Sequence, residues 1–443
     1  MASLDAEHAR RHWWSRRHPN TNEHPDSRKR KRQKEPSRQL GRRRLDSPRK
    51  VKRRRSRGAN DVDRHWTYSS YNSSTCNDRF VIVSYNILGD DNVSKHSDLY
   101  CNISAEHLSW EKRKMRICKE LKLYCPSILC FQEVDNFDDL AVLLRNDGYT
   151  GTYKGRTGCA NDGCAIFWKK DRFSLLHQES IEYQKYGLRD NVAQLCLFQV
   201  SADHSNHSTS QDVNSSLAGR TLLIGNIHVL FNPNRGDIKL GQIRILLERA
   251  NMISRKWDNN SVVLCGDLNS MPQSAIYRFI SSSELNILMY GRKQVSGQIE
   301  FPSTLEKCTP YNDGTRAQPC MTKVLRYSWS EEEIRIAGGS RGCTLLQSPL
   351  KLSSAYAGVP GTSDTRDSNG EPLATSYHSK FMGTVDYIWH SSDLLPVRVL
   401  ETLPINSLRK LKGLPSERWG SDHLALVCEL AFINGTTVPI DVS

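Results

Sequence analysis

Short apolar runs recur along the chain from Phe80 onward, each bounded by polar residues. Runs of this length that are rich in β-branched and aromatic residues predict buried β-strands. They cover residues 80–85, 127–131, 164–168, 193–198, 221–230, 262–265, 385–389 and 423–428. Between them, apolar residues recur at helical spacing over residues 109–123, 137–144, 237–257 and 274–280. Strands and helices in mixed order predict an α/β fold built as a layered sandwich.

This pattern is lost in three segments. Residues 1–77 are rich in Arg, Lys, Ser, Asn and Pro and show no sustained periodicity, which predicts a disordered arm. Residues 201–219 are Ser-, Asn- and His-rich and predict a surface loop. Residues 291–378 have only weak periodicity, and a structureless loop of that length is unusual in a compact domain. We therefore expect a folded domain over residues 78–435 with a flexible insertion at 291–378.

The net charge of +14 is concentrated in the arm. Residues 1–58 contain 21 Lys/Arg and 6 Asp/Glu, a net of +15, so the rest of the chain is close to neutral. The clusters Arg28–Arg32 and Lys50–Arg57 are typical of nuclear-localisation signals or nucleic-acid contacts. We expect a protein of the nucleus and cytoplasm.

Several protein classes are excluded by what the sequence lacks. No apolar stretch approaches the roughly 18 residues that would predict a membrane helix, so we expect no membrane partner. The sequence contains no G-x-x-x-x-G-K-[ST] loop, no G-x-S-x-G elbow and no H-E-x-x-H pair. Their absence argues against nucleotide-triphosphate motors, serine hydrolases and zinc proteases.

Acidic, asparagine and histidine side chains lie at or near the ends of the predicted strands. Strand ends at one rim of a sandwich can bring such groups together. Carboxylate and amide oxygens suit Mg²⁺, and a bound cation can polarise a phosphoryl oxygen and activate water. A His with an Asp partner can hold positive charge against a reacting phosphate. The pattern therefore predicts metal-assisted phosphoester cleavage, and the candidates are Asn86, Glu133, His228, Asp267, Asn269, Asp386, Asp422 and His423.

Each candidate alone is weak, but their order and context resemble the endonuclease/exonuclease/phosphatase superfamily. The matching blocks are Ser84–Leu88, Gln132–Asp135, Gly225–Val229, Gly266–Ser270, Gly383–Ile388 and Ser421–His423. More narrowly, the blocks Leu108–Arg113 and Phe231–Gln242 resemble the carbon catabolite repressor protein 4 family, in its plant and Angel branches. The resemblance implies a DNase-I-like fold, a four-layer sandwich of two β-sheets flanked by helices.

The resemblance also implies a role for each position. Glu133 would bind Mg²⁺ directly, and Asp422 would lie at the metal site. Asp267 would orient and deprotonate the attacking water, and Asp386 would orient and charge His423. The remaining implied roles are contact with phosphate oxygens for His228 and His423, support of metal or phosphate for Asn86 and Asn269, and stacking of an adenine base for Pro233 and Phe381.

The expected activity is Mg²⁺-dependent 3′-to-5′ removal of poly(A) tails from mRNA, with single-stranded RNA as the partner. The founding members carry a leucine-rich-repeat segment where this chain has its basic arm, so docking to a deadenylase complex is not assured. The block after His228 also differs from theirs and resembles the Angel branch. Two alternatives therefore stay open: a phosphatase for RNA 2′,3′-cyclic phosphate ends, and an RNA-binding regulatory factor that uses the arm.

Overall fold

The computed structural model describes residues 63–71, 78–201, 220–257, 260–298 and 329–433. By its internal contacts the chain divides into Met1–Arg57 and Gly58–Ser443, and the fold below is that of the second unit. The basic clusters and the predicted loop at 201–219 lie almost wholly outside the described residues. Among the described helices, none is long and apolar enough to span a bilayer.

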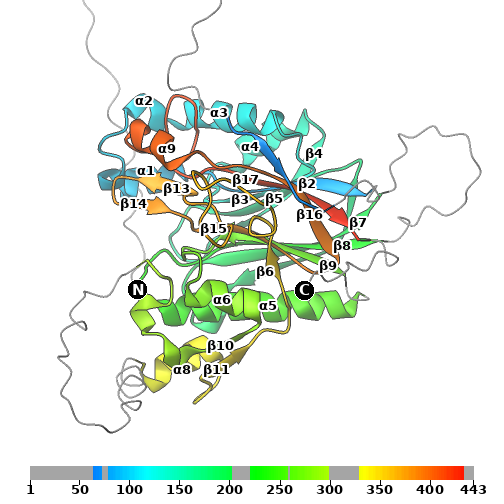
Figure 1. Cartoon of the computed structure of the whole chain (residues 1–443), viewed down its shortest axis with the longest axis vertical. Helices are drawn as coiled ribbons and strands as arrows, with labels where there is room; N and C mark the ends of the chain where they lie inside the picture. The colour runs from blue at the N-terminus through cyan, green and yellow to red at the C-terminus, as the bar shows by residue number, and fades with distance from the viewer. Residues whose placement is uncertain (1–62, 72–77, 202–219, 258–259, 299–328, 434–443) are drawn as a thin grey trace, which may run out of the picture. The chain divides into compact units, whose positions relative to one another are not determined.

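Two mixed β-sheets lie face to face (Figure 1). In each, a central parallel pair is flanked by antiparallel strands. The first sheet has the order β1 (Trp66–Tyr68), β16 (Leu394–Leu400), β17 (Leu426–Phe432), β2 (Arg79–Asn86), β3 (Ile128–Gln132), β5 (Gly163–Lys169) and β4 (Tyr149–Gly155). The second has the order β12 (Ser353–Ser354), β15 (Asp386–His390), β9 (Ser261–Asp267), β8 (Thr221–His228), β7 (Val192–Val200) and β6 (Phe173–Glu182).

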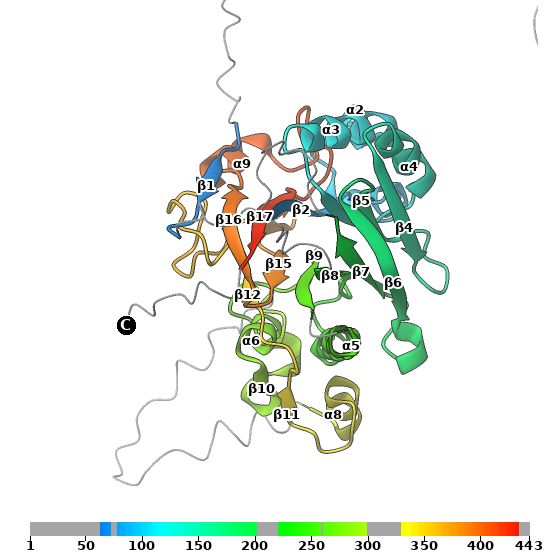
Figure 2. The ribbon, with the colours of Figure 1, turned by 90° about the vertical axis from the view of Figure 1, so that its right-hand side faces the viewer.

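Helices cover the outer face of each sheet, which completes a four-layer sandwich (Figures 1 and 2). The helices α3 (Trp110–Lys122) and α4 (Phe137–Arg145) lie over the first sheet, and α5 (Gly236–Lys256) and α6 (Ala275–Ser282) lie over the second. Smaller elements surround this frame: α1 (Asp90–Lys95), η2 (Ser97–Leu99), α2 (Ala105–Leu108), η3 (Tyr183–Tyr186), β10 (Glu284–Asn286), η4 (Ile287–Met289), η5 (Arg292–Gln294), α8 (Glu331–Gly338), β11 (Leu345–Gln347), β13 (Ser376–His378), β14 (Phe381–Gly383) and α9 (Ile405–Leu411). The DNase-I-like architecture expected from the sequence is confirmed.

The inner faces of the two sheets change from apolar to polar along the strands. Side chains alternate between the faces of a strand. On β2, Phe80 and Ile82 belong to the core between the sheets, whereas Val83 and Tyr85 pack outward under the helices. The same alternation places Asn86, two residues beyond Ser84, on the inner face. Every predicted strand has a counterpart, but β17 begins at Leu426, three residues later than predicted, which leaves His423 in the loop before it.

The insertion expected to be flexible over residues 291–378 is folded in the part that the structure describes. Trp329, Ala337, Leu346 and Leu352 are all buried in the core beneath the second sheet. The strand β11 pairs with β10, and β12 extends the second sheet beside β15. The apolar residues are too widely spaced to produce a periodic pattern, yet tertiary contacts bury them. Residues 299–328 lie outside the described residues.

The predicted boundary of the arm at residue 77 is also corrected. Residues 66–68 form β1 at the edge of the first sheet, paired with β16. Just before it, the guanidinium of Arg64 is buried against Glu120, with Nη1 and Oε1 3.0 Å apart. Arg64 also donates to the carbonyl oxygens of Glu401 and Ala425, at 2.8 and 2.6 Å. A single buried arginine gives no periodic signal, so the sequence pattern could not show this anchor.

We expect Arg64→Ala to lower the free energy of unfolding by about 3–5 kcal/mol, because it leaves the Glu120 carboxylate buried without its partner. Urea unfolding monitored by fluorescence measures this change. Lys112→Ala is the control, since Lys112 and Glu106 form an exposed ion pair that contributes at most about 1 kcal/mol. Equal effects of the two substitutions would show that Arg64 is not an anchor.

Candidate active site

The polar ends of the inner strand faces meet at one rim of the sandwich. In the second sheet, Asp267 on β9 is in register with His228 on β8 and with Asp386 on β15. From the first sheet, Asn86 donates through Nδ2 to Asp267 Oδ2 at 3.1 Å. Because Asn86 and Asp267 belong to different sheets, this bond joins the two sheets at the site.

Glu133 follows β3 directly and is held from several sides. Its Oε1 accepts from Asn86 Nδ2 at 2.9 Å, and its Oε2 accepts from Asn92 Nδ2 at 2.8 Å and the Gly89 amide at 3.1 Å. Its backbone φ is +56°, a left-handed conformation that is unusual for glutamate. Such strain persists where the surroundings impose it, and it is common at functional sites. The structure thus holds this carboxylate in one place beside Asp267 and His228.

Asp267 and Asn269 form a turn that points both side chains into the site. The Asn269 amide donates to Asp267 Oδ1 at 2.8 Å, and Asn269 Nδ2 lies 3.2 Å from His228 Nε2. Gly266 permits close packing here, since a Cβ at this position would lie 2.1 Å from the Ile227 carbonyl oxygen. Burial and the neighbouring Asp386 carboxylate raise the pKa of Asp267, against the opposing effect of the two imidazoles. A carboxylate with a raised pKa is suited to accept a proton.

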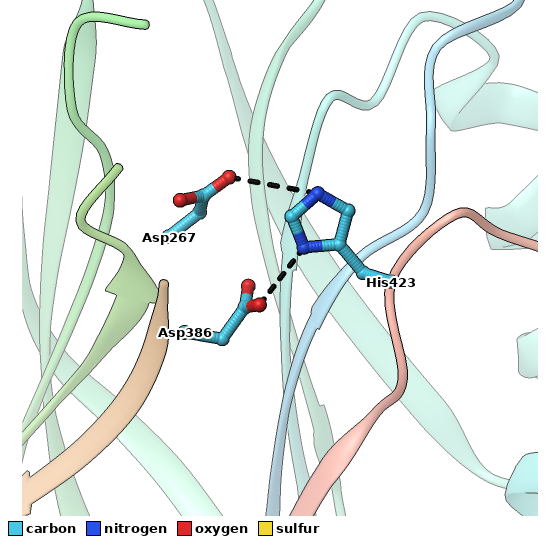
Figure 3. A group of neighbouring side chains, drawn as sticks. All are labelled: Asp267, Asp386 and His423. Carbon is cyan, nitrogen blue, oxygen red and sulfur yellow. Dashed lines mark hydrogen bonds and ion pairs between the residues drawn. The ribbon is translucent and has the colours of Figure 1, made fainter. Parts of the chain in front are cut away.

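His423 lies between the carboxylates of Asp386 and Asp267 (Figure 3). Its Nδ1 is 2.8 Å from Asp386 Oδ2, and its Nε2 is 3.9 Å from Asp267 Oδ2. Burial alone would lower the pKa of His423, but Asp386, Asp422 and Asp267 outweigh burial and raise it well above its usual value. These carboxylates therefore favour the protonated form of the His423 ring. By contrast, burial lowers the pKa of His228 despite the nearby Asp267, which favours a neutral ring.

Asp422 lies next to His423 and is buried. Its Oδ2 accepts from the hydroxyl of Tyr100 at 2.9 Å, a residue that follows η2. Burial and the Asp422 carboxylate raise the pKa of Tyr100, so the hydroxyl remains a donor. The site thus combines four carboxylates, those of Glu133, Asp267, Asp386 and Asp422.

The donor set fits a divalent metal ion. Asp267, Asp386 and His423 can each place one ligand atom within 4.8 Å of the others. We nevertheless expect the cation nearer Glu133 and Asp267, because His423 Nδ1 is already engaged by Asp386. Four carboxylates share this pocket with a charged His423 ring, and oxygen ligands with excess negative charge suit Mg²⁺. Direct coordination by Glu133 and Asp422 stays a prediction.

The two residues expected to stack a base are separate from this hydrogen-bonded cluster. Pro233 is half-buried in the loop between β8 and α5, and Phe381 is half-buried at the start of β14. The ring of Phe381 lies 6.0 Å from that of His378. Stacking of adenine between Pro233 and Phe381 stays a prediction.

Several supporting residues were not identified as site residues from the sequence. Arg113 on α3 is fully buried, and its Nη1 donates to the carbonyl oxygens of Ile87 and Leu88, which follow Asn86, at 2.9 and 2.7 Å. The same atom lies 3.5 Å from the carbonyl oxygen of Gly420, two residues before Asp422. Arg113 thus holds two loops of the site together. Its block, Leu108–Arg113, had already carried part of the family resemblance, whereas Asn92 and Tyr100 gave no signal.

Lys239 on α5 contacts the backbone of the site residue Asn269. It is fully buried, and its Nζ donates to the Asn269 carbonyl oxygen at 2.6 Å and lies 3.5 Å from that of Phe231. Burial lowers the pKa of Lys239 to about 7, against the opposing effect of Asp267. Asn269 has a φ of +44°. The hydrogen bond from Lys239 helps to hold this backbone conformation, and with it the direction of the Asn269 side chain.

We expect Lys239→Met to lower kcat roughly 10- to 100-fold while the protein stays folded, since small displacements of a catalytic group can cost this much. Methionine matches the volume of lysine but cannot donate to Asn269. Steady-state kinetics and circular dichroism measure the two quantities. Lys256→Met, at the exposed end of the same helix, is the control and should leave kcat unchanged. An unchanged kcat in Lys239→Met would remove this positioning role.

Fold and site together define a nuclease or phosphatase with a buried acidic and histidine cluster. Residues 83–423 match the Endonuclease/Exonuclease/phosphatase family, and the chain belongs to this family. It is 52% identical to carbon catabolite repressor protein 4 homolog 5 of Arabidopsis thaliana, over 88% of this chain and 85% of that protein. It is 31% identical to protein angel homolog 2 of Mus musculus, over 85% and 77%.

Among solved structures, the chain is similar to ANGEL2, described as a 2′,3′-cyclic phosphatase in complex with adenosine-2′,3′-vanadate. The TM-score is 0.66 and the sequence identity 31%, over 84% of this chain and 99% of that one. The resemblance to the carbon catabolite repressor protein 4 family, in its plant and Angel branches, is thus confirmed.

Proposed function

We propose that the protein is a Mg²⁺-dependent 3′-to-5′ exoribonuclease that shortens poly(A) tails. The observation that carries the proposal is the joining of Asp267, Asp386 and His423 with Glu133 across the two sheets. This arrangement offers a base, a charged imidazole and an anionic pocket around one position. The similarity to the plant carbon catabolite repressor protein 4 homolog supports the family resemblance, and that resemblance implies mRNA tails as the substrate.

In the proposed mechanism, each of these residues has a different role in hydrolysis. Asp267 accepts a proton as water forms a bond to phosphorus, and the bond from phosphorus to the 3′ oxygen of the chain breaks. The charged His423 donates a hydrogen bond to a phosphate oxygen, where negative charge increases in the transition state. Asp386 keeps His423 charged, and Asn269 donates alongside it. A Mg²⁺ ion bound near Glu133 would polarise the phosphate and lower the pKa of water.

A gel time course tests the proposal. The full chain is mixed with a 5′-labelled RNA that ends in about twenty adenines, in Mg²⁺ or in EDTA. The expected result is a ladder that shortens from the 3′ end and stalls at the first residue other than adenine, with no ladder in EDTA. Intact RNA in Mg²⁺, under conditions that hydrolyse another phosphoester, would overturn the assignment.

A second candidate is a phosphatase acting on RNA 2′,3′-cyclic phosphate ends. The similarity to ANGEL2 over most of this chain favours it. Both candidates place the 3′ end of an RNA in the same pocket, and they differ in which bond to phosphorus breaks. Loss of the cyclic phosphate without shortening of the chain would establish this second activity and exclude the first.

The basic arm is proposed to strengthen RNA association and to carry the protein into the nucleus. We expect deletion of residues 1–57 to weaken RNA binding, to reduce its salt dependence and to leave kcat unchanged, because phosphate contacts by Lys and Arg release counterions. The deletion stops at 57 because Arg64 and β1 belong to the folded domain. Binding is measured by anisotropy at several salt concentrations. Unchanged affinity at low salt would exclude an RNA-binding arm.

A further inference from the structure

An exposed pair of aromatic rings stands beside the site, outside the residues already assigned to catalysis or base stacking. Phe231 is 54% exposed although it is a large apolar residue. Its ring centroid lies 6.2 Å from that of His96, which is also exposed, and the rings are tilted by 42° rather than stacked. The nearby Ser94, Asn232 and Asn234 are exposed and polar. Because polar residues surround the two aromatic rings, this surface is poorly suited to binding an apolar face of another protein.

Both rings lie on segments of the chain that also contact residues of the site. Phe231 follows His228 by three residues, and its carbonyl oxygen lies 3.5 Å from Lys239 Nζ, the group that supports Asn269. His96 follows α1, from which Asn92 donates to Glu133 at 2.8 Å. The pair therefore connects the loop after β8 with the loop after β2, one from each sheet.

The β13–β14 turn is fixed to the same segment. The Ser379 amide donates to the Leu99 carbonyl oxygen at 3.1 Å, and Lys380 forms an ion pair with Asp98. These contacts place Phe381 on the hairpin beside η2, which begins one residue after His96. The segments that carry Phe381 and His96 are therefore held together.

We propose that Phe231 and His96 form a stacking platform for one further base of the RNA, separate from the base assigned to Pro233 and Phe381. The inference rests on the proposed function, since it requires an RNA in the pocket. A second stacked base means that the substrate is a single-stranded RNA end of at least two nucleotides rather than a free nucleotide. Every base has a π-face, so the platform adds affinity with little selectivity for sequence.

Equilibrium binding of a 5′-fluorescein-labelled oligo(A) tetranucleotide to the full chain in EDTA tests the platform without turnover. We expect Phe231→Ala to weaken binding about 5- to 100-fold, which corresponds to the loss of one stacked base. Phe231→Trp should restore binding to near the wild-type value. His96→Ala should weaken binding, and its effect should be smaller in the Phe231→Ala background because both rings serve one base. Met289→Ala, which removes another exposed apolar side chain, should change nothing.

An abasic ribose-phosphate tetramer separates stacking from the electrostatic contribution of the arm. Phe231→Ala and wild type should bind this tetramer with a ratio of affinities near one. Equal binding of oligo(A) by both proteins, or equal losses on both ligands, would overturn the platform. Failure of the proposed function is distinguishable, because then wild-type protein in Mg²⁺ would not shorten the RNA, whatever the binding ratio.

Discussion

Glu133→Gln is expected to reduce kcat/KM on the order of 10³-fold or more. Glutamine keeps the size and one oxygen of the side chain but removes the charge that a divalent cation requires. Electrostatic stabilisation by a bound metal amounts to several kcal/mol, and each 1.36 kcal/mol corresponds to a factor of ten in rate. The carboxylate is already aligned by Asn86, Asn92 and the Gly89 amide, so glutamine would occupy the same place without the charge.

Two measurements accompany this prediction. Steady-state kinetics over a range of Mg²⁺ concentrations gives the loss of rate, and calorimetric titration with Mg²⁺ should show weakened binding. The melting temperature should fall somewhat, because the glutamine nitrogen must face one of the donors that now bind the carboxylate, and circular dichroism shows whether the fold is kept. Glu106→Gln, at an exposed ion pair on α2, is the matched control. Near-normal turnover with unchanged Mg²⁺ binding in Glu133→Gln would refute the metal assignment.

Asp386→Asn is expected to lower kcat about 10²- to 10³-fold at neutral pH, as is found when one preorganised electrostatic contact is lost. The substitution removes the carboxylate that bonds to His423 Nδ1 at 2.8 Å. Burial, which lowers the pKa of His423, then meets less opposition, so the ring loses its charge at a lower pH. Asp138→Asn, at an exposed position in the first turn of α4, is the control.

The pH dependence gives this prediction a direction. The proposed mechanism requires a charged His423, so activity should be lost as pH rises through the pKa of His423, and in Asp386→Asn this limb should move to lower pH. The proposed mechanism also requires an ionised Asp267, whose pKa the Asp386 carboxylate helps to raise, so the acidic limb should move to lower pH too. A pH profile of kcat/KM reports both limbs. If Asp386→Asn lowered kcat/KM at every pH without shifting either limb of the profile, Asp386 would act only by positioning His423 and not by changing pKa values.

The positions of strands along the chain could be predicted where an apolar run is covered on both faces, although the buried strand β16 was missed. On β2, β3 and β9 the apolar runs are nearly continuous because both faces are covered. The strands β4 and β6 were missed, since β4 is only half-buried and several β6 residues are exposed, so their sequences mix polar and apolar residues. The strand β1 was missed for another reason: it has only three residues, and the adjacent Arg64 is held by contacts with distant parts of the chain.

The candidate site could be predicted as a set of residues but not as a geometry. The sequence placed Asn86, Asp267 and Asp386 at strand ends, and the register of β9 with β15 brings the two aspartates together. The bond from Asn86 to Asp267 depends on how two sheets far apart in sequence pack on each other. No local pattern encodes that distance.

By itself, the sequence determined the class of fold, through the local alternation of apolar and polar positions along each strand, and the family, through its ordered motif blocks. It also named the candidate site residues. Only the tertiary structure decided which loops support those residues. Arg113 reaches two site loops, Tyr100 reaches Asp422, and His96 approaches Phe231. These contacts join segments far apart in sequence, and packing of the folded chain sets them. The same packing raises the pKa of His423, because three carboxylates meet there only once both sheets have closed and together outweigh the lowering by burial.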